Sequence, residues 1–109
     1  MTRPLTRITR MMRGPGIDFG ASVAYPLIPA ELNAGLRMGV AEFDRGSVEV
    51  DLTYDEAIYV LEGEIEIDGD GETHRLRPGE CLWMPAGRKI VYRAPASCKF
   101  LYAIPSRQA

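Results

Sequence analysis

The sequence predicts a small all-β barrel built as one domain, and three features of the chain lead to this prediction. From residue 36 onward, short runs rich in Val, Ile, Leu, Tyr and Phe alternate with turn residues at regular intervals, which is typical of antiparallel barrels and sandwiches. No segment has the apolar periodicity of a helix of normal length. The 109 residues suffice to bury one hydrophobic core but not two.

Glycine and proline mark the ends of the predicted strands. The clearest hairpin turn is Asp68-Gly69-Asp70-Gly71, because both glycines permit positive φ and both aspartates can accept hydrogen bonds from nearby amides. Pro78-Gly79 and Pro85-Ala86-Gly87 mark the next connections in the same way. We therefore expect strands over residues 36–43, 47–53, 57–67, 72–77, 80–84, 89–94 and 98–104.

The residues before these strands fall into two parts. Residues 1–16 form a basic arm, whose arginines are spaced as on one face of a helix, whereas Pro4 and the short length favour a frayed tail or a segment packed on a partner subunit. Residues 17–35, which contain proline and glycine, are expected to be an irregular lead-in across the barrel surface. We therefore divide the chain into an arm over residues 1–16 and a barrel over residues 17–109. The arginines of the arm are Arg3, Arg7, Arg10 and Arg13.

Acidic and basic residues are segregated along the chain, although the net charge is only −2. Residues 42–80 carry most of the acids, while residues 81–109 carry basic side chains and no acidic ones. Solvated strand faces or salt bridges between neighbouring strands explain this pattern, and an anion site at Arg88, Lys89 and Arg93 is the functional alternative. The small net charge indicates no general attraction to nucleic acid.

The sequence favours a cytoplasmic protein with reduced thiols. Cys81 and Cys98 are far from any Cys-x-x-Cys arrangement, and the N-terminus has no apolar run of signal-peptide length. No stretch approaches the roughly 20 apolar residues that span a bilayer. We therefore expect neither a membrane nor a nucleic acid as a partner.

Two motif blocks, residues 56–63 and 79–87, keep the spacing of a known family pattern. In the first block, Glu56 and Gly63 lie at the glutamate and glycine positions of this pattern. In the second block, Gly79, Pro85 and Gly87 match all three backbone positions of the pattern. The chain therefore resembles a cupin, which implies a small single-domain β-barrel of the double-stranded β-helix or jelly-roll type.

The positions at which other cupins place metal-binding histidines carry different residues here. These positions are Val50 and Leu52 in the first block, or Glu49 and Asp51 if the gap is one residue longer, and Ile90 in the second block. Divalent transition metals need three or four imidazole, thiolate or carboxylate donors that converge on one point. The single histidine, His74, follows the Gly-Asp-Gly turn on a polar strand, which indicates a surface position. We therefore expect no metal and no other cofactor.

Two further segments are informative: Leu52-Thr53-Tyr54-Asp55-Glu56 running into Tyr59-Val60-Leu61-Glu62-Gly63-Glu64, and Lys99-Phe100-Leu101-Tyr102. Both look like the cupin domain of the ethanolamine-utilisation protein EutQ. The resemblance covers residues 36–105, and that family also has other residues where most cupins have histidines. It implies the acetate kinase activity attributed to the family, but the sequence contains no Gly-x-x-x-x-Gly-Lys loop for phosphate, and the chain lacks the long N-terminal region of EutQ.

The interior of such a barrel is expected to be a mostly apolar cavity. Side chains alternate in and out along a strand, so if Glu56 keeps the family's inward direction, Ile58 points inward with it. An apolar wall with a few polar groups is typical of a small-molecule pocket. The predicted substrate-binding residues are Met38, Val50, Leu52, Ile58, Ile90 and Phe100.

Glu56 is the first catalytic candidate, because burial raises the pKa of a carboxyl group towards neutrality, where it can serve as a general acid or base. A nearby phenol could donate a hydrogen bond to a substrate carbonyl and stabilise an enolate or oxyanion. The candidate phenols are those of Tyr54, Tyr92 and Tyr102. The structural alternative is that Glu56 is tied to Arg37, Arg93 or a tyrosine and holds the barrel mouth in shape.

The sequence leaves three hypotheses of function open. The first is a metal-independent enzyme that moves a proton on a small organic substrate, as an isomerase, cyclase, dehydratase or decarboxylase. The second is a non-catalytic small-molecule-binding or scaffold protein related to ethanolamine utilisation, and the third is the acetate kinase implied by the resemblance. The resemblance also implies a homodimer, with the apolar lead-in as a contact. Trp83, between Leu82 and Met84 on a predicted strand, is expected to be a core or dimer-contact residue, and stacking on a ligand is the alternative.

Overall fold

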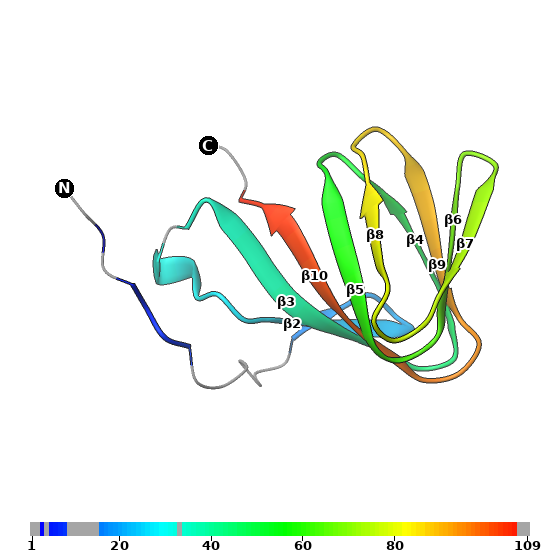
Figure 1. Cartoon of the computed structure of the whole chain (residues 1–109), viewed down its shortest axis with the longest axis horizontal. Coiled ribbons are helices and arrows are strands. Elements are labelled where there is room, and N and C mark those ends of the chain that lie inside the picture. The colour runs from blue at the N-terminus through cyan, green and yellow to red at the C-terminus, as the bar shows by residue number, and fades with distance from the viewer. Residues whose placement is uncertain (1–2, 4, 9–15, 33, 107–109) are drawn as a thin grey trace.

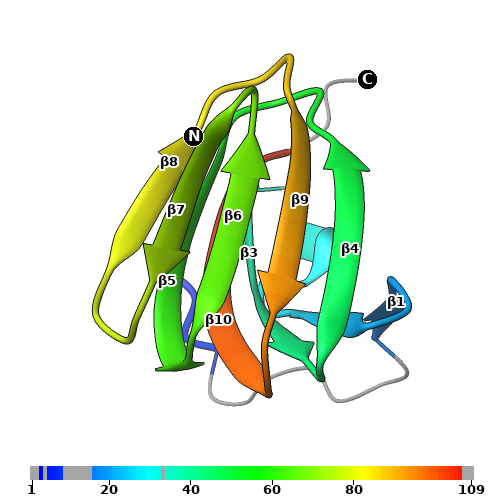
Figure 2. The same ribbon diagram turned by 90° about the vertical axis from the view of Figure 1, so that its right-hand side faces the viewer.

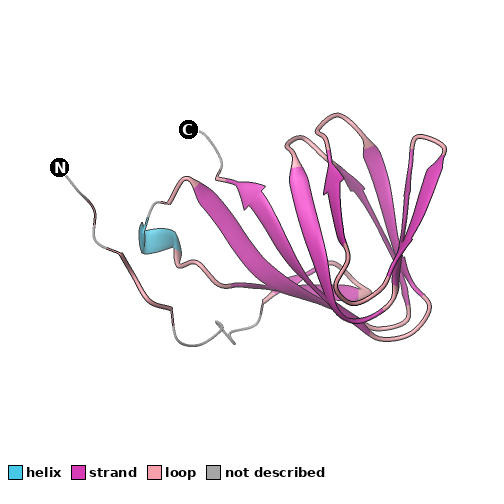
Figure 3. Ribbon diagram, viewed as in Figure 1, coloured by secondary structure: helices cyan, strands magenta, loops and turns pink. Residues whose placement is uncertain are grey.

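The computed structural model describes residues 3, 5–8, 16–32 and 34–106, and these residues are almost entirely β-structure (Figure 1, Figure 3). The strands are β1 (Ile17–Asp18), β2 (Ser22–Pro26), β3 (Leu36–Phe43), β4 (Gly46–Asp51), β5 (Glu56–Gly63), β6 (Ile65–Gly69), β7 (Glu72–Leu76), β8 (Cys81–Met84), β9 (Lys89–Ala94) and β10 (Cys98–Pro105). One short 3-10 helix, η1 (Ala30–Leu32), lies between β2 and β3. No helix in this part of the chain has the length and apolar character needed to cross a membrane.

The strands form two antiparallel sheets that pack into one domain. The larger sheet has the order β1-β2-β3-β10-β5-β8, and the smaller sheet has the order β4-β9-β6-β7. In Figure 2 the smaller sheet lies in front of β3, β5 and β10. After β3 the chain passes from one sheet to the other at most connections, so neither sheet can form without the other.

The hydrophobic core lies between the sheets and takes side chains from both. Ile58 and Val60 of β5 face Ile65 and Ile67 of β6, and all four side chains are at most 2% exposed. The strict alternation of β-strands explains why every second residue of these strands is buried. Each of these side chains contributes about 1.5–3 kcal/mol to folding through burial of apolar surface.

Three aromatic rings connect the two sheets. Phe43 of β3 and Phe100 of β10 come from the larger sheet, and Tyr92 of β9 comes from the smaller one. The ring centroids are 5.7 Å apart for Phe43 and Phe100, 6.0 Å for Tyr92 and Phe100, and 6.2 Å for Phe43 and Tyr92. Aromatic pairs at such separations add about 0.5–1.5 kcal/mol to burial alone. The ring of Tyr92 is therefore held in one position between the sheets.

The outer face of the smaller sheet carries ion pairs between neighbouring strands. The Arg93 guanidinium on β9 lies 2.5 Å from a carboxylate oxygen of Glu66 and 2.8 Å from one of Asp68, both on β6. Arg75 on β7 reaches Glu66 from the other side at 3.3 Å, and Arg88 lies within 3.5 Å of acidic side chains at the β6–β7 turn. These are the cross-strand salt bridges that the segregated charges suggested, and they engage two of the residues of the alternative anion site.

One predicted strand is wrong, because residues 57–67 form two strands in different sheets. β5 ends at Gly63 and β6 begins at Ile65. Gly63 has a φ of 75°, a left-handed conformation that turns the chain from one sheet to the other. The alternation of acidic and apolar residues continues across this turn, so periodicity alone does not reveal it.

The lead-in over residues 17–35 is also more regular than predicted, since it contains β1, β2 and η1. β2 pairs with β3 in the register Tyr25 with Val40, and β1 pairs with β2. Pro26 is the last residue of β2 and Pro29 directly precedes η1. The prolines therefore mark the ends of elements at the sheet edge and do not prevent strand formation.

The structure describes residues 3, 5–8 and 16 of the predicted arm, and these form neither helix nor strand. Leu5 is fully exposed, and residues 5–8 lie outside the larger sheet (Figure 1). The Arg3 guanidinium donates a hydrogen bond to the carbonyl oxygen of Leu32 at the end of η1. The helical face suggested by the arginine spacing includes Arg10 and Arg13, which lie outside the described residues.

Replacing Gly63 by alanine is expected to destabilise the fold. An added Cβ would collide with the carbonyl oxygen of Ser97 and lie 2.9 Å from Cys98 Cα, and backbone atoms of a strand cannot move aside independently. We expect a loss of about 2–4 kcal/mol in the free energy of unfolding, measured by urea denaturation.

Gly71→Ala is the matched control for this variant. Its φ is 82°, but an added Cβ would meet nothing within 4 Å. Backbone strain alone should then cost about 1–2 kcal/mol. Equal losses in the two variants would show that the contact with Ser97 and Cys98 contributes nothing.

Candidate functional site

A cavity of about 550 Å³ lies between the two sheets, and its wall comes from both of them. The wall is mostly apolar and includes Ala41 of β3, Val48 of β4 and Phe100 of β10. Residues of β1 and β2 and of the segment around η1 complete it. A concave, mostly apolar space of this volume is typical of a site for a small organic molecule.

A hydrogen bond between Glu56 and Tyr92 connects the two sheets at this wall. Glu56 is the first residue of β5 in the larger sheet, and Tyr92 lies on β9 in the smaller one. The Tyr92 hydroxyl donates to Glu56 Oε1 across 2.9 Å. Because the ring of Tyr92 is fixed by Phe43 and Phe100, this bond also fixes the orientation of the carboxylate.

Burial shifts the pKa values of both partners. Burial raises the pKa of Glu56 above its ordinary value of 4.5, and the hydrogen bond from Tyr92 opposes the shift only in part. The pKa of Tyr92 is raised by burial and by the negative charge of Glu56, so the phenol stays protonated as the donor. The proton equilibrium of Glu56 is therefore displaced towards neutrality, as general acid–base chemistry requires.

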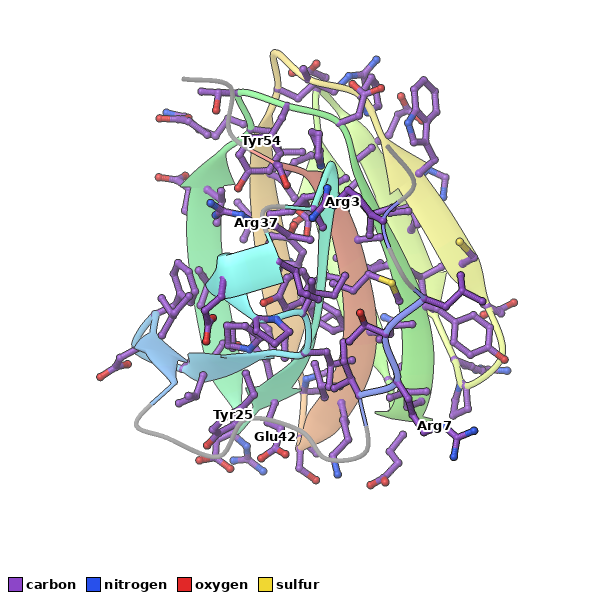
Figure 4. The ribbon with its side chains drawn as sticks, turned by 90° about the vertical axis from the view of Figure 1, so that its left-hand side faces the viewer. Arg3, Arg7, Tyr25, Arg37, Glu42 and Tyr54 are labelled. Carbon is purple, nitrogen blue, oxygen red and sulfur yellow. The ribbon has the colours of Figure 1, made fainter. Side chains whose placement is uncertain are left out.

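Two further phenols lie around this carboxyl group. Tyr102 on β10 lies over Gly39 of the neighbouring strand, where an added Cβ would collide with the hydroxyl and ring of Tyr102. The pKa of Tyr102 is raised by burial, by Glu56 and by Tyr54, and it is lowered in part by Arg37. Tyr54 precedes β5, is 39% exposed and lines the same cavity. In Figure 4 both Arg37 and Tyr54 lie above η1 in the view, and Arg37 is the nearer of the two.

Backbone and side-chain hydrogen bonds hold the segment that carries Tyr54. Leu52 exchanges backbone hydrogen bonds with the next loop, donating to Arg88 O at 2.8 Å and accepting from Gly87 N at 2.9 Å. Asp55 Oδ1 accepts from Ala86 N at 2.9 Å. The glycine and proline of the second motif block therefore shape the loop against which the first block is fixed.

The cavity wall contains seven of the residues that the sequence singled out. All four ionisable candidates line it, together with one apolar candidate each from β3, β4 and β10. These residues are Glu56, Tyr54, Tyr92, Tyr102, Met38, Val50 and Phe100. The sequence does not determine whether Tyr54, Tyr92 and Tyr102 point into the barrel. In the structure all three line the cavity.

Leu52, Ile58 and Ile90 do not line the cavity and belong instead to the hydrophobic core, where they are 3%, 1% and 2% exposed. They point inward, as the alternation along the strands predicts, but they lie in the packed core and not at the cavity wall. The cavity lies beside this core, and Phe43, Tyr92 and Phe100 belong to both. Ile90, for example, lies over Gly69 of β6. These three residues are therefore packing residues.

Arg37 is a charged cavity residue whose place the sequence did not predict. The structural alternative tied Glu56 to Arg37, Arg93 or a tyrosine, and the hydrogen bond from Tyr92 agrees with its third option. Within the described part of the chain Glu56 forms no ion pair with Arg37 or Arg93. Arg93 lies on the outer face of the smaller sheet, while Arg37 lines the cavity. Arg37 shares strand parity with Phe43, and this signal would have placed it inward once the direction of Phe43 was known.

The residues present do not fit a divalent metal. Among the described residues, no group of three or more His, Cys, Asp and Glu side chains converges on one point. Val50 and Ile90, at two of the positions where cupins place histidines, are direct cross-strand partners and offer only hydrocarbon. No step of the chemistry considered below passes through a metal ion.

The fold and the cavity define a protein of the cupin class, and solved structures agree. The cupin domain of an XRE family transcriptional regulator from Enterobacter cloacae superposes with a TM-score of 0.69 at 22% identity, covering 82% of this chain and all of that one. The predicted all-β barrel is therefore confirmed. The family model described as "Ethanolamine utilisation protein EutQ" matches residues 14–107, so the chain belongs to the EutQ family.

Named relatives of this family are similar over part of their length. The acetate kinase EutQ of Salmonella typhimurium is 32% identical over 76 residues, which cover 70% of this chain and 33% of that protein. The structure of the Clostridium difficile EutQ protein superposes with a TM-score of 0.77 at 26% identity, covering 89% of this chain and 80% of that one. The chain thus spans about a third of the length of the curated Salmonella relative.

The stability of the fold is expected to depend on the ionisation of Glu56. Below pH 4.5 the carboxyl is protonated in both the folded and the unfolded chain, so its ionisation costs the fold nothing. As the pH rises from 4.5 through the raised pKa of the folded state, the unfolded chain loses this proton first, and the fold loses stability. In Glu56→Gln, which retains an acceptor for Tyr92, this loss should disappear.

The measurement is urea unfolding of both proteins between pH 4 and pH 9. The free energy of unfolding of Glu56→Gln minus that of the wild type should rise with pH and then level off. Glu49→Gln, which removes an exposed carboxylate on β4 outside the cavity, is the matched control. A pH-independent difference for Glu56→Gln would contradict the proposed burial cost.

Proposed function

We propose that this chain is a metal-independent cupin that binds a small organic molecule in its cavity and transfers a proton on it. The observation that carries the proposal is the Glu56–Tyr92 hydrogen bond at the wall of an apolar cavity. A carboxyl group with a raised pKa, held in one orientation beside a space for a ligand, has the properties of a general acid or base. The reaction types that fit are isomerisation, cyclisation, dehydration and decarboxylation.

The polar residues divide into two roles in this proposal. Tyr92 donates its hydroxyl proton to the hydrogen bond with Glu56 and serves as a positioning residue. Tyr54 and Tyr102 form no side-chain hydrogen bond within the described residues, so their hydroxyl groups are free to meet a substrate. Glu56 would remove a proton next to a carbonyl group, and one of these phenols would donate to the oxygen on which negative charge develops.

A non-catalytic role related to ethanolamine utilisation is the alternative hypothesis. In that case the cavity would retain a small molecule, and the chain would act as a binding or scaffold protein in ethanolamine utilisation. The name of the Salmonella relative also suggests acetate kinase activity, but this chain spans only 33% of that protein, and its sequence has no Gly-x-x-x-x-Gly-Lys loop. Proton transfer uses the groups that line the cavity and is the better supported hypothesis.

Protein purified without added ligand is expected to retain an organic molecule and no stoichiometric metal. Native mass spectrometry and elemental analysis would measure both, and the extracted molecule would then serve as the candidate substrate. Glu56→Gln should still bind it while turnover falls by about 10²–10⁴-fold, the usual contribution of general acid–base catalysis. Glu49→Gln should behave as the wild type.

The outcomes of this experiment separate the hypotheses. Retention without turnover in the wild type would favour the non-catalytic alternative. A stoichiometric metal would contradict the metal-independent proposal, and an empty cavity in every preparation would remove its main support.

The proposal includes a homodimer that forms through the outer face of the larger sheet. Trp83 is 63% exposed there, so the core position among its predicted roles is wrong. Tyr59 and Leu61 of β5 are also exposed, at 43% and 40%. A cytoplasmic location is likewise part of the proposal and is supported by the free thiols of Cys81 and Cys98.

Light scattering after size-exclusion chromatography should give twice the chain mass of 12.1 kDa. Trp83→Glu places a charge on the proposed apolar interface and should shift the protein towards the monomer. His74→Glu, which adds a charge on the exposed face of β7, should leave the dimer intact. A wild-type mass of a single chain would refute the dimer.

A further inference from the structure

One cationic side chain lines the cavity among the residues that the structure describes, and it belongs to Arg37. Arg37 lies on β3 and is the register partner of Ile104 on β10, which also lines the cavity. Directly opposed residues of an antiparallel pair share a face of the sheet, so Arg37 and Ile104 lie on the cavity side together. The side chain is exposed, which places it towards the opening of the cavity.

Arg37 differs from the arginines on the sheet surfaces in having no carboxylate partner within the described part of the chain. Arg75, Arg77, Arg88 and Arg93 each lie within 4.0 Å of an acidic side chain. No such contact joins Arg37 to Glu56, although both line the same cavity. The guanidinium therefore has its hydrogen-bonding fork available for a ligand.

The charges of Arg37 and Glu56 both act on the phenol of Tyr102. The phenol of Tyr102 responds to both, since its pKa is raised by Glu56 and lowered by Arg37. Tyr102 therefore lies within electrostatic reach of the cation and of the buried carboxyl group. Arg37, Glu56 and Tyr102 all line the cavity, so a ligand bound there lies in the field of both charges.

We propose that the ligand is a small monocarboxylate with an apolar body, that its carboxylate binds to the Arg37 guanidinium, and that its hydrocarbon part lies against the apolar wall. This inference rests on the proposed function and names the class of substrate.

The charge and shape of the site favour this class over related ones. The planar guanidinium can bind a carboxylate through two parallel hydrogen bonds. A single cation balances one negative charge, so a phosphate dianion would keep an uncompensated charge beside an apolar wall. An ammonium group would be repelled by Arg37, and an uncharged alcohol would gain only the apolar contacts.

A set of six-carbon probes tests the proposal on the full chain. Hexanoate, hexan-1-ol, hexylammonium and hexyl phosphate would be titrated at pH 7 by calorimetry, with backbone amide NMR shifts locating each probe. Hexanoate should bind about tenfold more tightly than hexan-1-ol, as expected of a charge-assisted hydrogen bond at a partly exposed site. Hexylammonium and hexyl phosphate should bind more weakly than hexanoate.

Variants of Arg37 assign the effect to one side chain. Arg37→Gln should weaken hexanoate binding by about tenfold and leave hexan-1-ol binding unchanged, while Arg37→Lys should restore part of the loss. Arg45→Gln is the matched control, because Arg45 is an exposed arginine in the β3–β4 turn that does not line the cavity. It should bind all four probes as the wild type does.

Each other outcome overturns a defined part of the argument. If hexanoate and hexan-1-ol bind equally in the cavity and Arg37→Gln changes neither, the carboxylate inference is wrong while a binding cavity remains. Tighter binding of hexyl phosphate or hexylammonium would also refute it. If no probe shifts the cavity amides, the proposed binding function and the inference fall together.

Discussion

The hydrogen bond from Tyr92 to Glu56 is the interaction on which the site depends, because it connects the two sheets at the only place where a carboxyl group lines the described cavity. A buried carboxyl without a partner would cost about 1–3 kcal/mol or more. The aromatic contacts of Tyr92 with Phe43 and Phe100 hold the donor in place, so core packing and site geometry have the same origin. A change in either would alter both the cavity wall and the proton equilibrium of Glu56.

Much of the fold could be predicted from turn chemistry. The bounds expected for β3 and β9 agree with the structure, because glycine and proline flank strands of β-branched and aromatic residues. The division between β5 and β6 escaped prediction, since Gly63 has a positive φ within a run whose alternation does not change. β1 and β2 escaped for another reason, because β2 depends on pairing with β3 and β1 on pairing with β2, and no local pattern encodes these pairings.

The sequence predicts which side chains of the site point inward, but not which of them line the cavity and which belong to the core. Alternation along β5 places Glu56 and Ile58 on one face, and the structure agrees, yet Ile58 belongs to the core while Glu56 lines the cavity. Which part of a barrel remains a cavity depends on how its side chains pack in the folded protein, for example where Ile90 lies over Gly69. The contact between Glu56 and Tyr92 joins residues 36 positions apart in different sheets, so it required the folded structure.

Apolar residues at the histidine positions change what the remaining carboxyl group can do. A metal ion beside Glu56 would stabilise the ionised carboxylate and lower its pKa, whereas burial raises this pKa here. Val50 and Ile90, at two of the histidine positions, offer no metal ligand. The positive charge that does line the cavity, on Arg37, is exposed and forms no ion pair with Glu56 among the described residues. The Arg37 guanidinium and the Glu56 carboxyl group therefore line one cavity without forming an ion pair. In our proposal the first binds an anion and the second exchanges a proton.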